Sequence, residues 1–179
     1  AQASNTLIFA RSADAVGLDP HAQPAFSSLR LLELIYEPLV VFDPSLNLQP
    51  ELAESWEFNA DATKLTMHLR QGVTFHDGST FDSADVKASF TRILDENTKD
   101  ATRSNFLSIA SMDTPDANTI VFNLSQSDVP LLTAMASVNA AMVSSESIAN
   151  NTVATDGNGT GPFVLKEWRR GDRIVLARN

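Results

Sequence analysis

The sequence contains no cysteine, and this absence removes several kinds of chemistry at once. A chain without thiols has no disulfide bonds, no thiolate metal ligands and no cysteine nucleophile. The absence does not fix the cellular compartment, because many exported bacterial proteins also lack cysteine.

Histidine is scarce as well, since only His21, His68 and His76 occur. No two of them are three or four residues apart, so the sequence has no local metal-binding motif, and we expect surface or hydrogen-bonding roles for all three. There is also no Gly-x-Ser-x-Gly motif. We therefore predict no catalytic residue, no metal ligand and no cofactor. A hydrolase is the alternative from another class, and it would need a triad assembled from loop residues.

Long apolar runs and clusters of positive charge are missing too. No run of 18 apolar residues occurs, which excludes a typical membrane-spanning helix. Thirteen basic residues against 22 acidic ones give a net charge of −9, and this balance disfavours a nucleic-acid or anionic-membrane partner. The first residues, Ala1 to Ser4, resemble the small-residue stub that signal-peptide cleavage leaves, which suggests an exported protein.

What the sequence does have is enough apolar content, 43% of 179 residues, for one substantial domain or two small ones. Its clearest pattern is the alternation of apolar and polar residues at 65–70, which predicts a strand with one buried face. Residues 59–63 supply a turn back to a partner strand at 56–58. After an ordered loop at 71–79, Asp82 or Ser83 caps a helix with the inner face Val86, Phe90, Ile93 and Leu94.

The other elements are less sharply marked. Residues 106–112 are compatible with a short helix or a strand, and residues 144–161, which have few apolar side chains, are interpreted as a linker between two modules. We further predict a strand buried on both faces at 6–10, a helix at 24–36, strands at 39–42 and 119–124, a helix capped by 127–130, a short buried strand at 140–143, and a hairpin at 163–168 and 173–177.

The glycine-rich stretch 157–162 (GNGTGP) raises the question of a phosphate-binding loop. Such loops open a helix, whereas here Pro162 and a predicted strand follow. A tight turn that re-enters a sheet explains the glycines better.

Three loops at the ends of predicted elements are candidates for ligand contacts. They span residues 13–17, 103–106 and 137–139. Loops held by a rigid scaffold are where binding proteins place such contacts, although an ordinary solvated loop is the alternative for each.

Several short motifs, taken in order along nearly the whole chain, resemble the family 5 extracellular solute-binding proteins. These are the dipeptide, oligopeptide and nickel receptors of ABC importers. The motifs are LDPH (18–21), IYEPLV (35–40), LAESW (52–56), LRQGVTFHDG (69–78), FDSADV (81–86) with SF (89–90), and GTGPF (159–163).

The resemblance implies a mixed α/β (α+β) fold, the first part of a two-lobed periplasmic-binding-protein clamshell with the second lobe absent. Residues 1–38 would begin lobe I, residues 39–150 would form its small α/β subdomain, and residues 151–179 would be a linker and a return hairpin into lobe I. The ligand would bind between the lobes, with the missing lobe supplying most of its contacts.

The implied function is the substrate-binding component of an ABC importer. It would capture a peptide, a metal complex or another small solute, act as a monomer without catalysis, and deliver the solute to the membrane permease subunits. The protein would be periplasmic or extracellular, and a membrane-anchored lipoprotein form is compatible with this. A lone lobe that serves only as a structural or protein-interaction domain is the alternative.

The resemblance also implies ligand-binding residues. Asp14 is the first candidate, because peptide-binding members place an acidic or main-chain contact at that point of the first lobe. The full set is Asp14, Ala15, Val16, Asn105, Phe106, Ser137 and Asn139.

Overall fold

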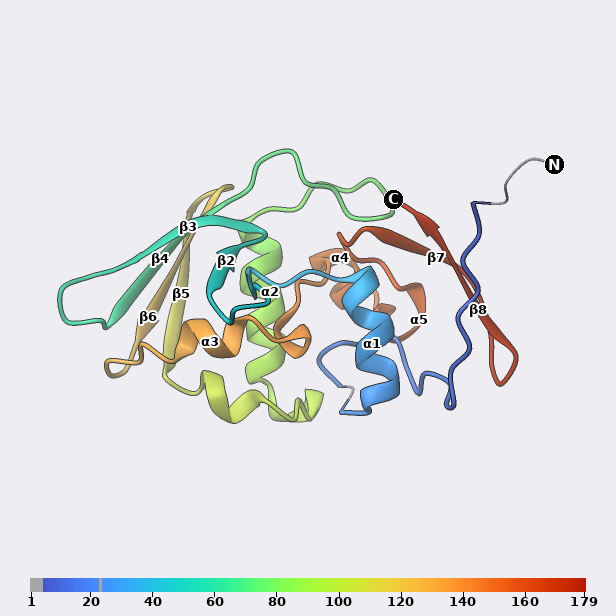
Figure 1. Cartoon of the computed structure of the whole chain (residues 1–179). Helices are drawn as coiled ribbons and strands as arrows, with labels where there is room; N and C mark the ends of the chain where they lie inside the picture. The colour runs from blue at the N-terminus through green and yellow to red at the C-terminus, as the bar shows by residue number, and fades with distance from the viewer. Residues whose placement is uncertain (1–4, 23) are drawn as a thin grey trace.

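The computed structural model describes residues 5–22 and 24–179. A sheet lies at one end of the molecule and a two-stranded hairpin at the other, with the helices between them (Figure 1). The helices are α1 (Phe26–Ile35), α2 (Ser83–Leu94), α3 (Leu131–Met135), α4 (Ser145–Ala149) and α5 (Val153–Asp156), with 3-10 turns η1 (Glu96–Thr98), η2 (Arg103–Phe106) and η3 (Val138–Ala140). The strands are β1 (Val40–Phe42), β2 (Leu48–Pro50), β3 (Ala53–Phe58), β4 (Lys64–Leu69), β5 (Ile109–Asp116), β6 (Thr119–Leu124), β7 (Phe163–Arg169) and β8 (Arg173–Arg178).

The main sheet is antiparallel with the strand order β3-β4-β6-β5. The predicted alternation in β4 is confirmed, because Leu65, Met67 and Leu69 are buried while the residues between them are not. Leu65 and Met67 pair with Phe122 and Ile120 of β6, so the two strands present one continuous apolar face.

Helix α2 covers this face, and its predicted cap and inner face are confirmed. Asp82 accepts a hydrogen bond from the amide of Ala84, and the Asp85 side chain accepts one from the amide of Asp82, which together form a capping box. Val86, Phe90 and Ile93 are fully buried, and Leu94 is half-buried. The Phe90 ring meets Phe122 edge to face at 5.1 Å between centroids.

A second apolar cluster surrounds α1. Leu31, Leu32, Ile35 and Tyr36 are buried together with Val143 and Val153, and the hairpin contributes Leu165 and Trp168 at its margin. The predicted hairpin is therefore confirmed, and β7 and β8 pair antiparallel. Of the described helices, none is long and apolar enough to cross a membrane.

The expected strand at Thr6–Ala10 is wrong. The segment is extended but has no ladder partner among the described residues. Leu7, Ile8 and Phe9 are 90%, 89% and 80% exposed. An apolar run becomes a buried strand only where neighbouring strands satisfy its backbone groups and cover both of its faces.

The expected strand at Ala140–Val143 is also wrong, although the segment is buried as predicted. It forms no ladder with a neighbouring strand of the described chain. The Val143 amide donates to Ser89 Oγ at 3.0 Å, the Val143 carbonyl accepts from the same hydroxyl at 3.1 Å, and the Met142 amide donates to the Glu37 carbonyl. The open question at 106–112 is resolved as η2 ending at Phe106 and β5 beginning at Ile109.

The interpretation of 144–161 as a linker is wrong too. The stretch contains α4 and α5, and Ser147, Val153 and Asn158 are buried in it. Its polar side chains bond to one another, so a low apolar content here does not mean a lack of structure. The expected side-chain cap from 127–130 is absent, since Pro130 occupies the N-cap of α3 without a side-chain hydrogen bond.

Candidate functional site

Asp14 lies in the loop before α1 and connects this loop to the hairpin. Its carboxylate accepts hydrogen bonds from Trp168 Nε1 at 3.1 Å, from the Gly171 amide at 2.9 Å and from the Ala15 amide at 2.8 Å. The Gly171 amide, the Trp168 side chain and the Ala15 amide hold the pKa of this carboxyl below its ordinary value, against an opposing effect of desolvation. Asp14 is therefore a fixed negative charge at the turn of the hairpin.

The surroundings of Asp14 carry charge of both signs. The Arg170 guanidinium lies over the Trp168 ring, with its central carbon 4.3 Å from the ring centroid. Its positive charge also lowers the pKa of Asp14. Both carboxylate oxygens of Asp14 already accept hydrogen bonds from the chain, so its effect on a ligand would be mainly electrostatic. Val16 beside it is 58% exposed, while Ala15 is buried.

Asn105 and Phe106 lie in η2, and the structure separates their environments. Asn105 is exposed and borders a shallow hollow of about 640 Å³, which Val129 and Leu131 also line where the chain enters α3. Phe106 is fully buried, with its ring 5.5 Å from that of Phe90. The Phe106 side chain therefore belongs to the core and offers no surface to a ligand.

Ser137 lies just before η3, and Asn139 lies within it. The Ser137 hydroxyl accepts from the Asn139 amide at 3.2 Å, which caps this short turn. Asn139 is only 6% exposed, and its Nδ2 donates to the Pro20 carbonyl at 2.7 Å. Asn139 thus joins η3 to the segment that leads from Asp14 to α1.

The three predicted loops come from distant parts of the sequence but are linked in the fold. Helix α3 contacts η2 on one side and leads into η3 on the other. In Figure 1 the stretch with η1 and η2 and the loop before α1 both lie along the lower edge of the molecule. The two lie toward opposite ends of this edge, since η2 is beside the sheet and Asp14 bonds to the hairpin turn, so the structure does not bring Asn105 together with Asp14. The accessible candidates along the edge are Asp14, Val16, Asn105 and Ser137.

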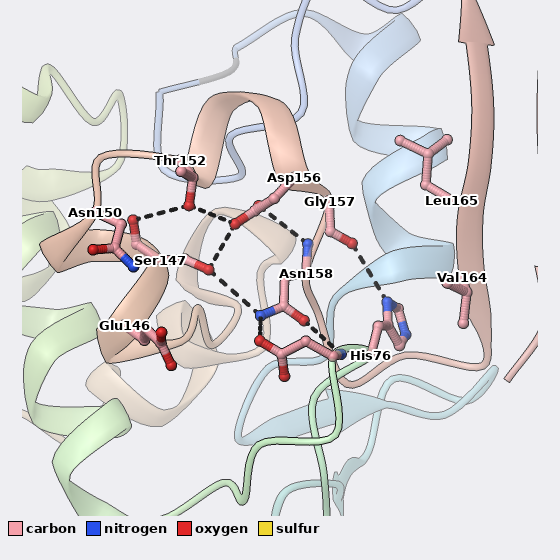
Figure 2. A pocket seen from close by; sticks show the side chains of 11 residues that line it. His76, Glu146, Ser147, Asn150, Thr152, Asp156, Gly157, Asn158, Val164 and Leu165 are labelled. Atoms are coloured by element: carbon pink, nitrogen blue, oxygen red, sulfur yellow. Dashed lines mark hydrogen bonds between the residues drawn. The ribbon is translucent and has the colours of Figure 1, made fainter.

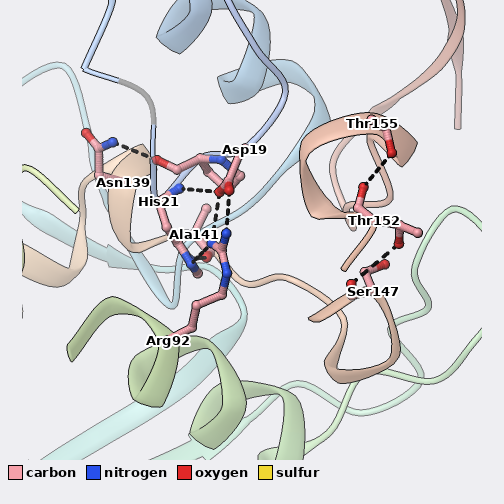
Figure 3. Close-up of polar contacts among 9 residues, drawn as sticks. Asp19, His21, Arg92, Asn139, Ala141, Ser147, Thr152 and Thr155 are labelled. Carbon is pink, nitrogen blue, oxygen red and sulfur yellow. Dashed lines mark hydrogen bonds and ion pairs between the residues drawn. The ribbon is translucent and has the colours of Figure 1, made fainter. Parts of the chain in front are cut away.

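A buried charged cluster that sequence reasoning missed joins α2 to the segment before α1 (Figure 3). The Arg92 guanidinium of α2 forms a two-pronged ion pair with Asp19, with Nη1 at 2.9 Å from Oδ1, and Nη1 also lies 2.9 Å from His21 Nδ1. His21 Nε2 lies 2.9 Å from the Ala141 carbonyl. Burial lowers the pKa of His21 to about 4, so its ring is neutral at physiological pH. The motif LDPH was the only signal for this cluster.

A second polar cluster lies on the other side of α1, around a hollow of about 290 Å³ (Figure 2). Asn158 Nδ2 donates to Asp77 at 2.7 Å, and Asp156 accepts from the hydroxyls of Ser147 and Thr152, each at 2.7 Å. His76 Nε2 lies 2.9 Å from the Gly161 carbonyl. These groups satisfy one another and brace the glycine-rich turn against its neighbours.

The glycine-rich turn itself fits its neighbours closely. The Gly161 amide donates to the Ile35 carbonyl at 2.8 Å, and the His76 amide donates to the Gly159 carbonyl at 2.9 Å. The stretch therefore turns the chain from α5 into β7, as the sequence predicts. Across residues 5–22 and 24–179, no group of three or more His, Asp or Glu side chains is placed to hold a metal ion.

Comparison with known proteins identifies the family. Residues 47–179 match the model of bacterial extracellular solute-binding proteins, family 5 Middle, so the chain belongs to this family. It is 29% identical to the probable D,D-dipeptide-binding periplasmic protein DdpA of Escherichia coli K12, over 97% of this chain and 36% of that protein. It is 27% identical to the glutathione-binding protein GsiB of Salmonella paratyphi A, over 99% of this chain and 35% of that protein.

Solved structures give the same result. The binding protein AgaA of A. tumefaciens R10, in complex with agropinic acid, matches with a TM-score of 0.88 and 36% identity over 93% of this chain and 34% of that one. The ABC transporter-associated periplasmic binding protein DppA of Helicobacter pylori, in complex with the peptide STSA, matches with a TM-score of 0.81 and 27% identity over 93% of this chain and 38% of that one. The chain thus has the mixed α/β fold of one part of a two-lobed periplasmic binding protein, and it spans about a third of the length of these relatives.

Proposed function

We propose that this chain forms part of the substrate-binding component of an ABC importer, which captures a small solute and delivers it to membrane permease subunits. The observation that carries the proposal is the family match over residues 47–179. The ligand stabilises a closed arrangement of two lobes, and the permease recognises this closed form.

The solute belongs to the class of short peptides or amino-acid conjugates. Two relatives are named for D,D-dipeptides and for glutathione, and one similar structure holds agropinic acid. Such ligands combine charged and polar groups, and the fixed charges of Asp14 and Arg170 beside one candidate loop suit a solute of this kind.

The wider arrangement is part of the same proposal. Residues 1–38 begin lobe I, 39–150 form its subdomain and 151–179 lead back into lobe I, with the short helix α5 and the hairpin β7–β8 in the last segment. The division is supported by the two apolar clusters, one around the sheet and one around α1 and the hairpin. The protein acts as an exported monomer and binds its solute without catalysis.

The test is the substitution Asp14→Ala in a two-lobed protein that contains this chain. We expect about tenfold weaker binding, because the substitution removes a fixed charge near the ligand and loosens the loop that carries it. Calorimetry with the dipeptide Met-Leu, glutathione and agropinic acid would measure the affinity. Asp61→Ala is the matched control, since Asp61 is also an exposed turn aspartate with a lowered pKa but lies at the far β3-β4 turn. Equal affinities of the Asp14→Ala and wild-type proteins would remove Asp14 from the site.

One observation favours the second candidate, a protein-interaction domain. Leu7, Ile8 and Phe9 form an exposed apolar run, which is a common feature of surfaces that another polypeptide covers. A two-lobed protein that bound none of the three solutes would favour this alternative.

A further inference from the structure

Helix α2 carries a line of polar side chains that bond to distant segments of the chain. Asp85, Ser89 and Arg92 are spaced four and three residues apart, so they lie on one face of the helix. Asp85 Oδ1 accepts from the Ser145 amide at 2.8 Å, and Ser89 Oγ exchanges hydrogen bonds with Val143. We call these three residues the polar seam of α2. Asp85 and Ser89 thus bond to backbone groups of Val143 and Ser145 that have no strand partner in the part of the chain that the structure describes.

Arg92 extends the seam to the segment before α1. Its guanidinium donates hydrogen bonds to both carboxylate oxygens of Asp19, whose side chain is 10% exposed, and Nη1 also donates to His21 Nδ1. Arginine carries only donors, so His21 Nδ1 must accept the hydrogen bond, and the ring proton therefore sits on Nε2. From there it donates to the Ala141 carbonyl at 2.9 Å. One cation thus sets both the orientation and the tautomer of a fully buried histidine.

Residues 19–21 contact η3 at its middle residue and just past its C-terminal end. The Pro20 carbonyl accepts from Asn139 Nδ2 at 2.7 Å, and His21 donates to Ala141 just past η3. The same three residues are continuous in the chain with the loop that carries Asp14 and Val16. Two candidate ligand loops, around Asp14 and around Ser137, therefore meet at one short segment that Arg92 fixes to the scaffold.

We propose that Arg92 is a positioning residue of the solute site, which holds the loops around Asp14 and Ser137 in their binding arrangement through Asp19, His21 and Asn139. This inference rests on the proposed function for its link to solute binding. Arg92 touches neither candidate loop directly, so its effect passes through the segment 19–21. Loops that are fixed before the ligand arrives lose less conformational entropy on binding, which raises affinity without a new contact.

The first experiment needs no ligand. Arg92→Lys keeps the positive charge beside Asp19 but loses the planar guanidinium, which donates to Asp19 and His21 at the same time. Long-range 1H–15N NMR of this chain should show the Nε2-protonated tautomer of His21 in the wild type and a mixture of tautomers in the variant. The backbone amides of 14–16 and 137–139 should shift with it. Lys87→Met is the control, because Lys87 is an exposed residue of the same helix, and it should leave these signals in place.

A single Nε2 tautomer and unshifted loop amides in the Arg92→Lys chain would overturn the positioning role. Should the variant fail to fold, His21→Asn serves instead, since it removes the contact of the ring with Ala141 while leaving the Arg92–Asp19 pair. It should shift the amides of 137–139, and unchanged amides there would likewise contradict the proposal.

The second experiment connects the positioning role to binding. In a two-lobed protein that contains this chain, Arg92→Lys should weaken the best-bound of Met-Leu, glutathione and agropinic acid about tenfold, while Lys87→Met should not. Shifted loops with unchanged affinity would contradict the inference and leave the proposed function standing. If the wild type bound none of the three solutes, the proposed function would fail, and the NMR result would still decide whether Arg92 positions the loops.

Discussion

At the scale of single residues, the buried His21 and the half-buried Glu37 have pKa values shifted in opposite directions. Burial lowers the pKa of His21 to about 4, whereas burial raises the pKa of Glu37 to about 7, with the neighbouring Glu51 carboxyl adding to the effect. Glu37 lies between the end of α1 and the start of β1, where its carbonyl accepts from the Met142 amide at 2.9 Å. The two residues therefore make the stability depend on pH in opposite directions.

The Glu37 effect can be isolated by the substitution Glu37→Gln. In the unfolded chain this carboxyl ionises near its ordinary value of 4.5, and in the folded chain at about 7. The protonated form thus favours folding, so its contribution is fully present below pH 4.5 and is lost as the pH rises to 7. Glutamine mimics the protonated acid, and the variant should gain stability relative to the wild type over this interval.

The measurement is the thermal midpoint of both proteins at a series of pH values from 4.5 to 8. The difference between variant and wild type cancels the contribution of His21, which both proteins share. Glu54→Gln, at an exposed position of β3, is the control and should give a difference that stays flat. A flat difference for Glu37→Gln as well would contradict the assigned pKa shift.

At the scale of elements, the sequence predicts the strands, caps and hairpins whose residue pattern is local in the chain. The alternation in β4, the capping box of α2 and the hairpin of β7 and β8 depend on neighbours in the chain, and all three are confirmed. The segment 141–145 could not be predicted in this way, because its partners Asp85 and Ser89 come more than fifty residues earlier. The polar cluster of 144–161 was missed for a similar reason, since one of its partners is Asp77.

The glycine-rich turn gives a prediction at the same scale. A Cβ on Gly159 would lie 2.7 Å from the carbonyl carbon of Ile35, which is helix backbone and cannot move aside as a side chain would. Gly159→Ala should therefore separate the turn from α1 and cost about 3 kcal/mol or more of unfolding free energy, as severe steric substitutions do.

Gly72→Ala is the matched control for this turn. A Cβ there meets nothing within 4 Å, although the φ of +74° is unfavourable for alanine. This control should cost only about 1–2 kcal/mol. Urea denaturation would give both values, and a Gly159→Ala chain as stable as the Gly72→Ala chain would refute the close approach to α1.

At the scale of the whole molecule, the family resemblance predicted the fold better than the site. The ordered motifs were enough to place the chain in its family and to predict a mixed α/β fold, which is confirmed. They did not indicate that Phe106 and Asn139 would be buried, because burial depends on packing partners that no motif specifies. The candidate contacts at Asp14, Val16, Asn105 and Ser137 remain predictions.

The exposed run at Leu7–Phe9 also belongs to this scale. Its composition is that of a buried strand, yet nothing in the described chain covers it. The chain aligns with about a third of each relative. A strand that the rest of a two-lobed protein buries would therefore be exposed in this chain. For the proposed function we expect the same of the solute, because one lobe without its partner would bury too little of a small ligand for tight binding.

Calorimetry on this chain and on a two-lobed protein that contains it tests the central claim most directly. Met-Leu, glutathione and agropinic acid are titrated into each protein under the same conditions. We predict that the chain alone binds each solute with a Kd of about 1 mM or weaker, while the two-lobed protein binds at least one of them about a hundredfold more tightly. Micromolar binding by the chain alone, or no binding by the two-lobed protein, would contradict the account.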